Sequence, residues 1–343
     1  MKPSFPPFRP RFPWIGGDLQ TLRNYLSPGG WDLSAWPSER LFFETDDGSG
    51  DQLQGVLHRN GDGPLVVLLH GLTGCEESFY VLETARFLLS QELSVLRLNL
   101  RGAGPSRKTC RGHYCAGSSD DLATVLGQLP RDLVRRGLVL IGYSLGGNIV
   151  LKYLSEKTRA EKTWAEKVGA EQSGAENPVT VEPTCAIAIS APIDLAAASR
   201  RMMAPRNRLY HGWLLKRMAE AAAAGGAVLT DTEQSAIAGA RTVYAFDDVF
   251  VAPRNGFADA DDYYRTCSAG GMLADITTPV LLIHARNDPW IPADAFENLP
   301  LAGLAKISLA LADSGGHVGF HGRTGRTPWH NQCAYTYLSS FLK

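Results

Sequence analysis

The stretch LVLIGYSLGGNIVLKYL, residues 138–154, decides how this chain is organised. Four apolar residues lead into Gly142, Ser144 has a glycine two places on either side, and an apolar stretch typical of a helix follows. The G-x-S-x-G pattern is weak alone, but here it follows a buried strand and opens a helix, which is the context it requires. Gly142 and Gly146 are small because the backbone at such a turn is crowded. The stretch therefore predicts an exposed nucleophilic hydroxyl at Ser144, with a helix N-cap serine as the alternative.

Apolar runs of strand length recur along the chain and alternate with helix-length segments. Two early strands are expected in RLFFETDDG (40–48) and DQLQGVLHR (51–59). The later runs are PLVVLLHG (64–71), SVLRLNLRG (94–102), LVLIGYS (138–144), CAIAISAP (185–192), TPVLLIHARNDP (278–289) and KISLALADSGGH (306–317). Strands that are apolar on both faces and alternate with helices are typical of a parallel sheet covered on both sides. We predict an α/β fold with a mostly parallel eight-stranded sheet and helices on both faces.

Two segments interrupt this alternation and suggest the domain organisation. We predict a core of residues 1–194 and 272–343, in which residues 1–40 form a proline-rich arm and a helix. Residues 195–271 predict a mainly helical cap over the site. In the insert at 160–180, Ala-Glu recurs every five residues, a period that turns about 140° further around a helix at each repeat. That period makes no single apolar face, so we interpret the insert as a solvated helix or a partly disordered segment.

A histidine that follows the last predicted strand is the expected general base. A serine hydroxyl becomes a strong nucleophile only when a neighbouring base accepts its proton. His317 lies in ADSGGHVGF, where glycines on one side and a short apolar stretch on the other suit an exposed loop. His321 and His330 are nearby alternatives, and a structural loop histidine is the simpler interpretation. We expect His317 to be the base.

The base needs a carboxylate that holds its tautomer and stabilises the imidazolium. Asp288 lies at the end of the penultimate strand, in VLLIHARNDPWIP, where a turn aspartate before proline is the simpler interpretation. Asp194, after AISAPI, is the second candidate, although it fits better as the entry to the cap. The chain order Ser144, Asp288, His317 is the order of the triad in α/β-hydrolases. We therefore expect Asp288 to be the acid.

Backbone amides are the expected donors to an oxyanion formed at the serine. One donor should be the N–H of Leu145, directly after the nucleophile, and the other the N–H of Leu72, in the loop LLHGLTG after the third strand. His70 in that loop is expected to be structural. The cap offers a set of apolar residues that could line an acyl pocket or form the cap's own core: Met202, Met203, Trp213 and Leu214.

Composition and charge exclude several classes of function. The 343 residues carry a formal net charge of −1, which leaves no electrostatic footprint for nucleic acid. No apolar run is long enough for a membrane-spanning helix, and the N-terminus lacks the apolar core of a signal peptide. No metal or dinucleotide motif occurs, so no cofactor is expected, and the six cysteines are expected to be free thiols. We expect a cytoplasmic protein without an integral membrane segment, and the oligomeric state is left open.

Taken in order along the chain, the motifs resemble those of the YheT-like α/β-hydrolases, whose eukaryotic relatives include membrane-bound monoacylglycerol and phospholipid hydrolases. The matching segments are GGDLQTL, LLHGLTGCEESFY, NLRGAGPS, GYSLGGNIVLKYL, FDDVFVAPRNGFADADDYY, ARNDPWIP and GGHVGF. The FDDVF segment is the most family-specific of these. Ser144, Asp288 and His317 fall on the family's triad positions, and Leu72 and Leu145 fall on its oxyanion positions. The resemblance implies hydrolysis of carboxylic esters, with short- to medium-chain acyl groups and a small-molecule ester as substrate.

Two alternatives to this ester hydrolase remain. The same triad would serve an acyltransferase or a thioesterase, since only the acyl acceptor or carrier differs, and product analysis with added alcohol separates the acyltransferase. A non-catalytic ligand-binding module could keep the serine turn as scaffold, because a fold alone does not establish a function. Absence of fluorophosphonate labelling at Ser144 would support that module.

Overall fold

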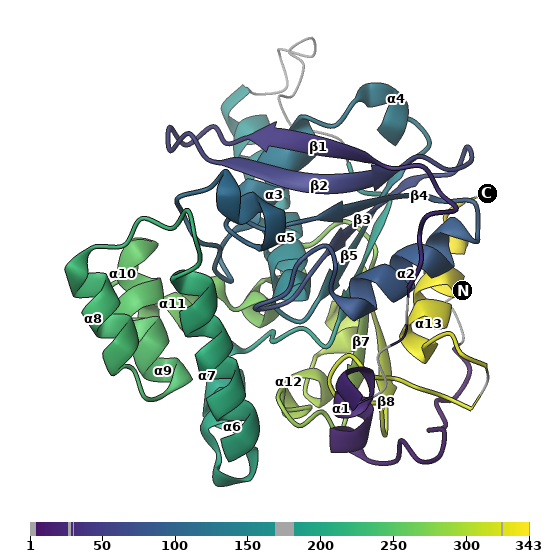
Figure 1. The fold of residues 1–343 in the computed structure, drawn as a ribbon. Coiled ribbons are helices and arrows are strands. Elements are labelled where there is room, and N and C mark those ends of the chain that lie inside the picture. The colour runs from purple at the N-terminus through teal and green to yellow at the C-terminus, as the bar shows by residue number, and fades with distance from the viewer. Residues whose placement is uncertain (1–4, 27–28, 30, 169–181, 324, 343) are drawn as a thin grey trace.

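The computed structural model contains one eight-stranded sheet with the strand order β1-β2-β4-β3-β5-β6-β7-β8 (Figure 1). It describes residues 5–26, 29, 31–168, 182–323 and 325–342. The strands are β1 (Glu39–Glu44), β2 (Gln52–His58), β3 (Leu65–Leu69), β4 (Ser94–Leu98), β5 (Leu138–Tyr143), β6 (Cys185–Ile189), β7 (Val280–Ala285) and β8 (Ile307–Ala312). The β1-β2 and β2-β4 pairs are antiparallel, and all the others are parallel. The predicted α/β fold is confirmed.

The central strands are buried on both faces, which explains their continuous apolar sequence. In β3 every residue is buried, and Val66 and Leu68 pack on one face while Leu65, Val67 and Leu69 pack on the other. Helices α2 (Phe79–Leu89) and α13 (Trp329–Ser339) supply buried residues on the first face, and α3 (Ser119–Gly127) and α5 (Leu145–Val168) on the second. The sheet is thus the middle layer of three.

The chain between β6 and β7 is helical and has a hydrophobic cluster of its own. Its helices are α6 (Leu195–Met203), η2 (Pro205–Asn207), α7 (Arg208–Ala222), α8 (Asp231–Gly239), α9 (Val243–Phe246), the π-helix η3 (Asp247–Val251), α10 (Ala252–Arg254), α11 (Ala260–Cys267) and η4 (Ala269–Asp275). Met202, Leu214, Met218, Phe246 and Phe250 form the centre of the cluster. Figure 1 shows α6 to α11 gathered on one side of the sheet. The mainly helical insertion is confirmed, and the division into core and cap at residues 195 and 271 stays a prediction.

The N-terminal arm packs beside the loop that precedes α13. The Arg11 N–H donates to the His321 carbonyl oxygen at 3.0 Å, and the Trp329 indole N–H donates to the Pro6 carbonyl oxygen at 2.7 Å. The helix α1 (Gly17–Leu26) follows where GGDLQTLRNYL predicts it, and its residues Gln20, Thr21 and Asn24 are buried although they are polar. The arm therefore brings α1 against the C-terminal part of the chain.

The pentapeptide insert lies partly outside the described residues. Helix α5 continues past Ala160 to Val168, while residues 169–181 are not described. The remaining short helices, α4 (Arg131–Val134), α12 (Asp294–Glu297), η1 (Gly104–Lys108) and η5 (Leu301–Gly303), lie in connections between strands. Across the described part of the chain, every helix is too short or too polar to cross a membrane.

Candidate active site

Ser144 occupies a strained turn between β5 and α5. Its φ of 49° is in the left-handed region, which residues with a side chain rarely adopt. The Ser144 N–H donates to the Ile189 carbonyl oxygen at 2.8 Å, which ties the turn to β6. A Cβ atom at Gly146 would lie 2.4 Å from the His70 carbonyl oxygen, so only glycine fits there. The crowding expected from the sequence is therefore present, and it presents the Ser144 side chain at the carboxyl edge of the sheet.

The structure brings Ser144, His317 and Asp288 together in one chain of short contacts. The His317 Nε2 atom lies 3.0 Å from the Ser144 Oγ, and its Nδ1 atom lies 2.8 Å from the Asp288 Oδ2. Asp288 follows β7, and His317 follows β8. Neighbouring parallel strands end at the same edge of the sheet, so residues 173 positions apart in the sequence meet there.

Asp288 is held as a buried, ionised acceptor. It is 1% exposed, and its Oδ1 accepts the N–H groups of Trp290 and Ile291 at 2.8 and 3.0 Å. Burial raises the pKa of this carboxyl, but the His317 ring and the hydrogen bonds together outweigh it and hold the pKa below its ordinary value. The carboxylate is thus charged at neutral pH and can orient the Nδ1–H of His317.

Two residues that the sequence analysis does not single out hold the His317 loop. The Asn287 Oδ1 accepts the N–H groups of Gly315 and Gly316, each at 3.0 Å. The Thr21 Oγ1, from α1, accepts the His317 N–H at 2.8 Å. Both residues lie in matching segments, GGDLQTL and ARNDPWIP, but their role depends on contacts between segments that lie far apart in the chain.

The alternative base and acid candidates have other partners. His321 is buried, and its Nε2 lies 3.1 Å from the Asn24 Nδ2. His330 is buried, and neither of its ring nitrogens has a hydrogen-bond partner among the described residues. Burial lowers the pKa of both rings, to about 2 for His321 and about 3 for His330. Asp194 is the N-cap of α6 and accepts the Ala197 N–H at 2.8 Å. None of the three reaches Ser144.

Leu72 and Leu145 line the same cavity as Ser144. Within the described ranges, the backbone N–H of neither residue donates a hydrogen bond. The Leu72 loop is held by two tyrosine hydroxyls, since Tyr80 accepts the Gly71 N–H at 2.9 Å and Tyr114 accepts the Thr73 N–H at 2.7 Å. Two unused donors therefore lie beside the serine on rigidly supported backbone.

His70 supports this loop, as its place in LLHGLTG predicts. Its ring is fully buried, its Nδ1–H donates to the Gly71 carbonyl oxygen at 2.8 Å, and its Nε2 accepts the Leu100 N–H at 3.1 Å. Burial lowers the pKa of His70 to about 4, so the ring is neutral. His70 is therefore a structural link between two loops of the site.

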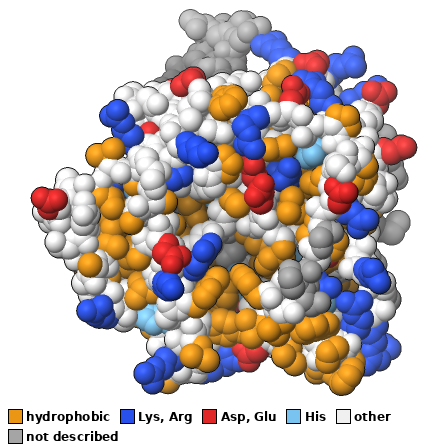
Figure 2. Space-filling model, in the orientation of Figure 1, with side chains coloured by type: hydrophobic (Ala, Val, Ile, Leu, Met, Phe, Trp, Pro, Cys, Tyr) orange, Lys and Arg blue, Asp and Glu red, His pale blue; other side chains and the backbone are white. Residues whose placement is uncertain are grey.

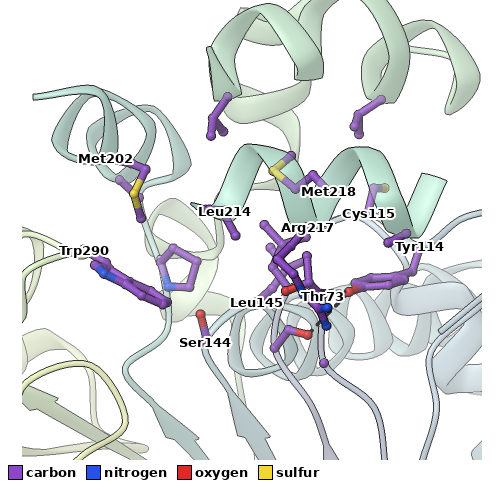
Figure 3. Close-up of a pocket in the computed structure, with 18 of the residues that line it drawn as sticks. Thr73, Tyr114, Cys115, Ser144, Leu145, Met202, Leu214, Arg217, Met218 and Trp290 are labelled. Carbon is purple, nitrogen blue, oxygen red and sulfur yellow. Dashed lines mark hydrogen bonds between the residues drawn. The ribbon is translucent and has the colours of Figure 1, made fainter. Parts of the chain in front are cut away.

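A cavity of about 710 Å³ opens above the serine, between the sheet edge and the helical segment. Figure 3 shows Met202, Leu214 and Met218 above Ser144, with Trp290 on one side and Tyr114 on the other. Of the four apolar residues that the sequence analysis names, Met202, Trp213 and Leu214 line the cavity and Met203 does not. Met202 and Leu214 also belong to the hydrophobic cluster of the helical segment, so they serve both roles.

The mouth of the cavity has an apolar rim. The ring centroids of Tyr25 on α1 and Trp213 on α7 lie 5.7 Å apart, both side chains are partly exposed, and both line the cavity. Figure 2 shows hydrophobic side chains gathered on the face around α1 and α7.

Within the described residues, no group of three or more His, Cys, Asp or Glu could hold a metal ion. The site is thus a largely apolar chamber with Ser144 and His317 at its floor.

The fold is that of a known family. A model of the alpha/beta hydrolase family matches residues 66–326. The chain therefore belongs to the α/β-hydrolase family. Among solved structures, the Pyrococcus furiosus esterase Pf2001 superposes with a TM-score of 0.57 at 17% identity, covering 91% of this chain and 96% of that one. At this identity the likeness shows the fold alone.

Relatives with curated names narrow the class. The Escherichia coli protein YheT is 30% identical over 288 residues, which cover 82% of this chain and 78% of YheT. A monoacylglycerol lipase from Saccharomyces cerevisiae is 27% identical over 299 residues, covering 83% of this chain and 61% of the lipase. The resemblance to YheT-like α/β-hydrolases is thereby confirmed, and the chain is an enzyme of the esterase and lipase type.

A pair of glycine substitutions tests the strained turn. In Gly146→Ala the new Cβ would lie 2.4 and 2.7 Å from the carbonyl oxygens of His70 and Leu69, which are backbone atoms. We expect Ser144 to be displaced, with turnover lowered about 100-fold or more, together with a lower melting temperature. The matched control is Gly212→Ala on α7, where nothing lies within 4 Å. There we expect the free energy of unfolding to rise by about 1 kcal/mol. Equal behaviour of the two variants in thermal unfolding would contradict this account.

The buried state of His330 predicts a pH dependence of stability. The folded pKa is lowered to about 3, while an unfolded histidine titrates near 6.5. As pH falls below about 6.5, the unfolded chain binds a proton at residue 330 that the folded chain does not. The free energy of unfolding therefore decreases by up to about 1.4 kcal/mol for each pH unit because of His330.

His330→Met removes this titrating group. The difference in unfolding free energy, variant minus wild type, should therefore increase by up to about 1.4 kcal/mol for each unit that the pH falls from 6.5 to 4. Denaturant titrations at several pH values measure it, and a flat difference would show that the His330 pKa is not lowered.

Proposed function

We propose that this enzyme hydrolyses carboxylic esters through a Ser144–His317–Asp288 triad and a covalent acyl-enzyme. The observation that carries the proposal is the unbroken pair of contacts, 3.0 Å from Ser144 Oγ to His317 Nε2 and 2.8 Å from His317 Nδ1 to Asp288 Oδ2. A nucleophile within hydrogen-bond reach of a base, which a third group orients in turn, is the arrangement that activates a serine.

In the first half-reaction, the Ser144 Oγ attacks the ester carbonyl carbon while His317 Nε2 accepts the hydroxyl proton. The carbonyl π electrons move to the oxygen, and the Asp288 carboxylate stabilises the imidazolium through the Nδ1–H. The Trp290 ring, whose centroid lies 4.4 Å from that of His317 at an interplanar angle of 31°, packs against the imidazole. An aromatic face near a forming cation is electrostatically favourable. Trp290 is therefore more than simple packing in this mechanism.

The Leu72 and Leu145 N–H groups would donate to the oxyanion of the tetrahedral intermediate. Among the described residues neither amide donates to another protein group, so both are available to an oxyanion. The intermediate collapses when its C–O bond to the alcohol breaks, and His317 Nε2–H protonates the departing alcohol oxygen. Water then repeats the sequence on the acyl-enzyme, His317 again accepting and returning the proton, and the carboxylic acid leaves.

The apolar lining of the cavity supports the proposal that the substrates are esters with short- to medium-chain acyl groups. Its walls include the side chains of Met202, Leu214 and Met218, which would exclude water from an alkyl chain. The yeast relative is named a monoacylglycerol lipase, which supports a glycerol-like alcohol among the candidate leaving groups. The partner we propose is a small-molecule ester in the cytoplasm.

A chain-length series tests the reaction and the pocket. We expect the wild type to hydrolyse p-nitrophenyl acetate through decanoate, with turnover declining toward palmitate. In Ser144→Ala, turnover should fall by at least about 10⁴-fold, and fluorophosphonate labelling should disappear. The control Ser90→Ala changes an exposed serine at the end of α2 and should stay within about twofold of wild type. Persistent activity in Ser144→Ala would refute the serine mechanism.

The role of Asp288 is tested by removing its charge alone. Asp288→Asn keeps the side-chain shape but cannot hold the required tautomer of His317, so kcat should fall by about 10³- to 10⁴-fold with KM nearly unchanged. The control is Asp313→Asn, which removes the same charge from a side chain that is 91% exposed. Steady-state kinetics on p-nitrophenyl butyrate compare the two. A kcat for Asp288→Asn within tenfold of wild type would assign Asp288 a structural role.

A further inference from the structure

A polar cluster lies in the wall of the cavity, and the ester mechanism does not use it. It consists of Ser199 on α6, Asp247 at the first position of the π-helix η3, and Tyr264 on α11. All three residues line the same cavity as Ser144. Their neighbours on that wall are largely apolar, Met202 and Phe250 among them. A carboxyl group in such a wall requires a physical reason, because burying a charge without compensation is costly.

The carboxyl group of Asp247 is only half satisfied by the protein. The Tyr264 hydroxyl donates to its Oδ2 at 2.6 Å and also lies 3.1 Å from the Ser199 Oγ. Asp247 is 7% exposed, yet among the described residues its Oδ1 has no hydrogen-bond partner and no Lys or Arg pairs with it. A carboxylate oxygen accepts up to two hydrogen bonds, so Oδ1 is an unused acceptor at the cavity wall.

The neighbouring acid shows that this arrangement is specific to Asp247. The Asp248 Oδ1 accepts the Ala260 N–H at 3.0 Å and so holds the start of α11, a structural role. In the described part of the chain, the Asp247 side chain accepts no backbone N–H. Asp247 is the first residue of a π-helical turn and lines the cavity. Such π-helical turns are frequent at functional sites.

We propose that Asp247, together with the Ser199 hydroxyl, forms a subsite that binds a hydroxyl group carried by the ester substrate. The inference rests on the proposed ester hydrolysis and names a class of ester that the site prefers. The substrate hydroxyl would donate to Asp247 Oδ1, while Ser199, whose own proton is directed at the Tyr264 oxygen, holds the Tyr264 hydroxyl in place beside it. It would sit either on the alcohol, as in a polyol ester, or on the acyl chain, as in a hydroxyacyl ester.

Two observations favour a hydroxyl over a cationic group as the ligand. Among the residues that line the cavity, Arg217 and Arg254 offset Glu77 and Asp247, so there is no net negative charge that would attract a cation. Burial raises the pKa of Asp247 to about 7, with the Tyr264 hydrogen bond opposing it, so the carboxyl is partly neutral near pH 7. A neutral carboxyl group both donates and accepts hydrogen bonds, which matches the hydrogen bonding of a hydroxyl. It carries no negative charge that would bind a cation.

Matched ester pairs that differ only in hydroxyl groups test the subsite. On the alcohol side the pair is 2,3-dihydroxypropyl octanoate against propyl octanoate, and on the acyl side it is p-nitrophenyl 8-hydroxyoctanoate against p-nitrophenyl octanoate. The measured quantity is the ratio of kcat/KM within each pair. We expect the wild type to prefer the hydroxylated ester by at least about tenfold in one pair, and that pair shows which part of the substrate carries the group.

Variants then assign the preference to the cluster. Asp247→Leu keeps the approximate shape and removes both acceptor oxygens, so the ratio should fall below about twofold. Asp261→Leu makes the same change at an exposed position of α11 that does not line this cavity, and it should keep the wild-type ratio. Thermal unfolding checks that each variant is folded. If Asp247→Leu does not fold, Ser199→Ala tests the same subsite, and its ratio should fall about threefold.

The outcomes separate this inference from the proposed function. Hydrolysis of all four esters by the wild type without a preference in either pair overturns the subsite and leaves the ester hydrolase standing. An equal loss of kcat/KM on both members of a pair in folded Asp247→Leu overturns it too, since that pattern indicates a structural role. If the wild type hydrolyses none of the four esters and Ser144 is not labelled by a fluorophosphonate, the proposed function itself fails.

Discussion

The strained turn at Ser144 is the constraint on which the rest of the site depends. A serine at a φ of 49° is held there because β5 enters the turn from a fully buried sheet and α5 leaves it against the same sheet. The space between them is so small that a Cβ atom at Gly142 or Gly146 would collide with backbone. Burial of the two flanking elements supplies the free energy that keeps one unfavourable residue in place. The exposed hydroxyl is a consequence of that burial.

The other residues of the site reach Ser144 from separate parts of the chain. Asp288 and His317 arrive on loops after two neighbouring parallel strands, and the Leu72 loop arrives after a third. Each loop is anchored by side chains behind it: Asn287 and Thr21 hold the His317 loop, and Tyr80 and His70 hold the Leu72 loop. The helical segment covers the cavity. Its polar cluster at Asp247 places hydrogen-bonding groups in a wall that is otherwise largely apolar. The triad candidates thus lie at the sheet edge and the proposed hydroxyl subsite lies in the covering helices, an arrangement that follows from where the elements end.

Much of this could be predicted from local patterns. The continuous apolar runs predict the eight strands, the G-x-S-x-G context predicts the turn, and the positions of Asp288 and His317 after the last two strands bring them to one edge. Their catalytic roles stay predictions. Met203 was grouped with Met202 as a residue of either the acyl pocket or the cap's own core, and it belongs to neither, because adjacent residues of a helix point in different directions. The packing of Trp290 against the His317 ring is visible only in the structure.

The sequence by itself determined the fold class, the turn at Ser144 and the order of the three triad candidates, because strand burial and the serine turn are local properties encoded in short runs of residues. Tertiary structure alone decided which polar residues stand behind and around the site. Thr21 meets a backbone amide 296 residues away, and Tyr264 meets an aspartate 17 residues away on another helix. Such contacts depend on how whole elements pack, and packing of distant elements is set by their combined burial and not by any short pattern. The oriented hydroxyl of Ser144 was visible in the sequence, whereas the half-satisfied carboxyl of Asp247 became visible only when three helices enclosed it.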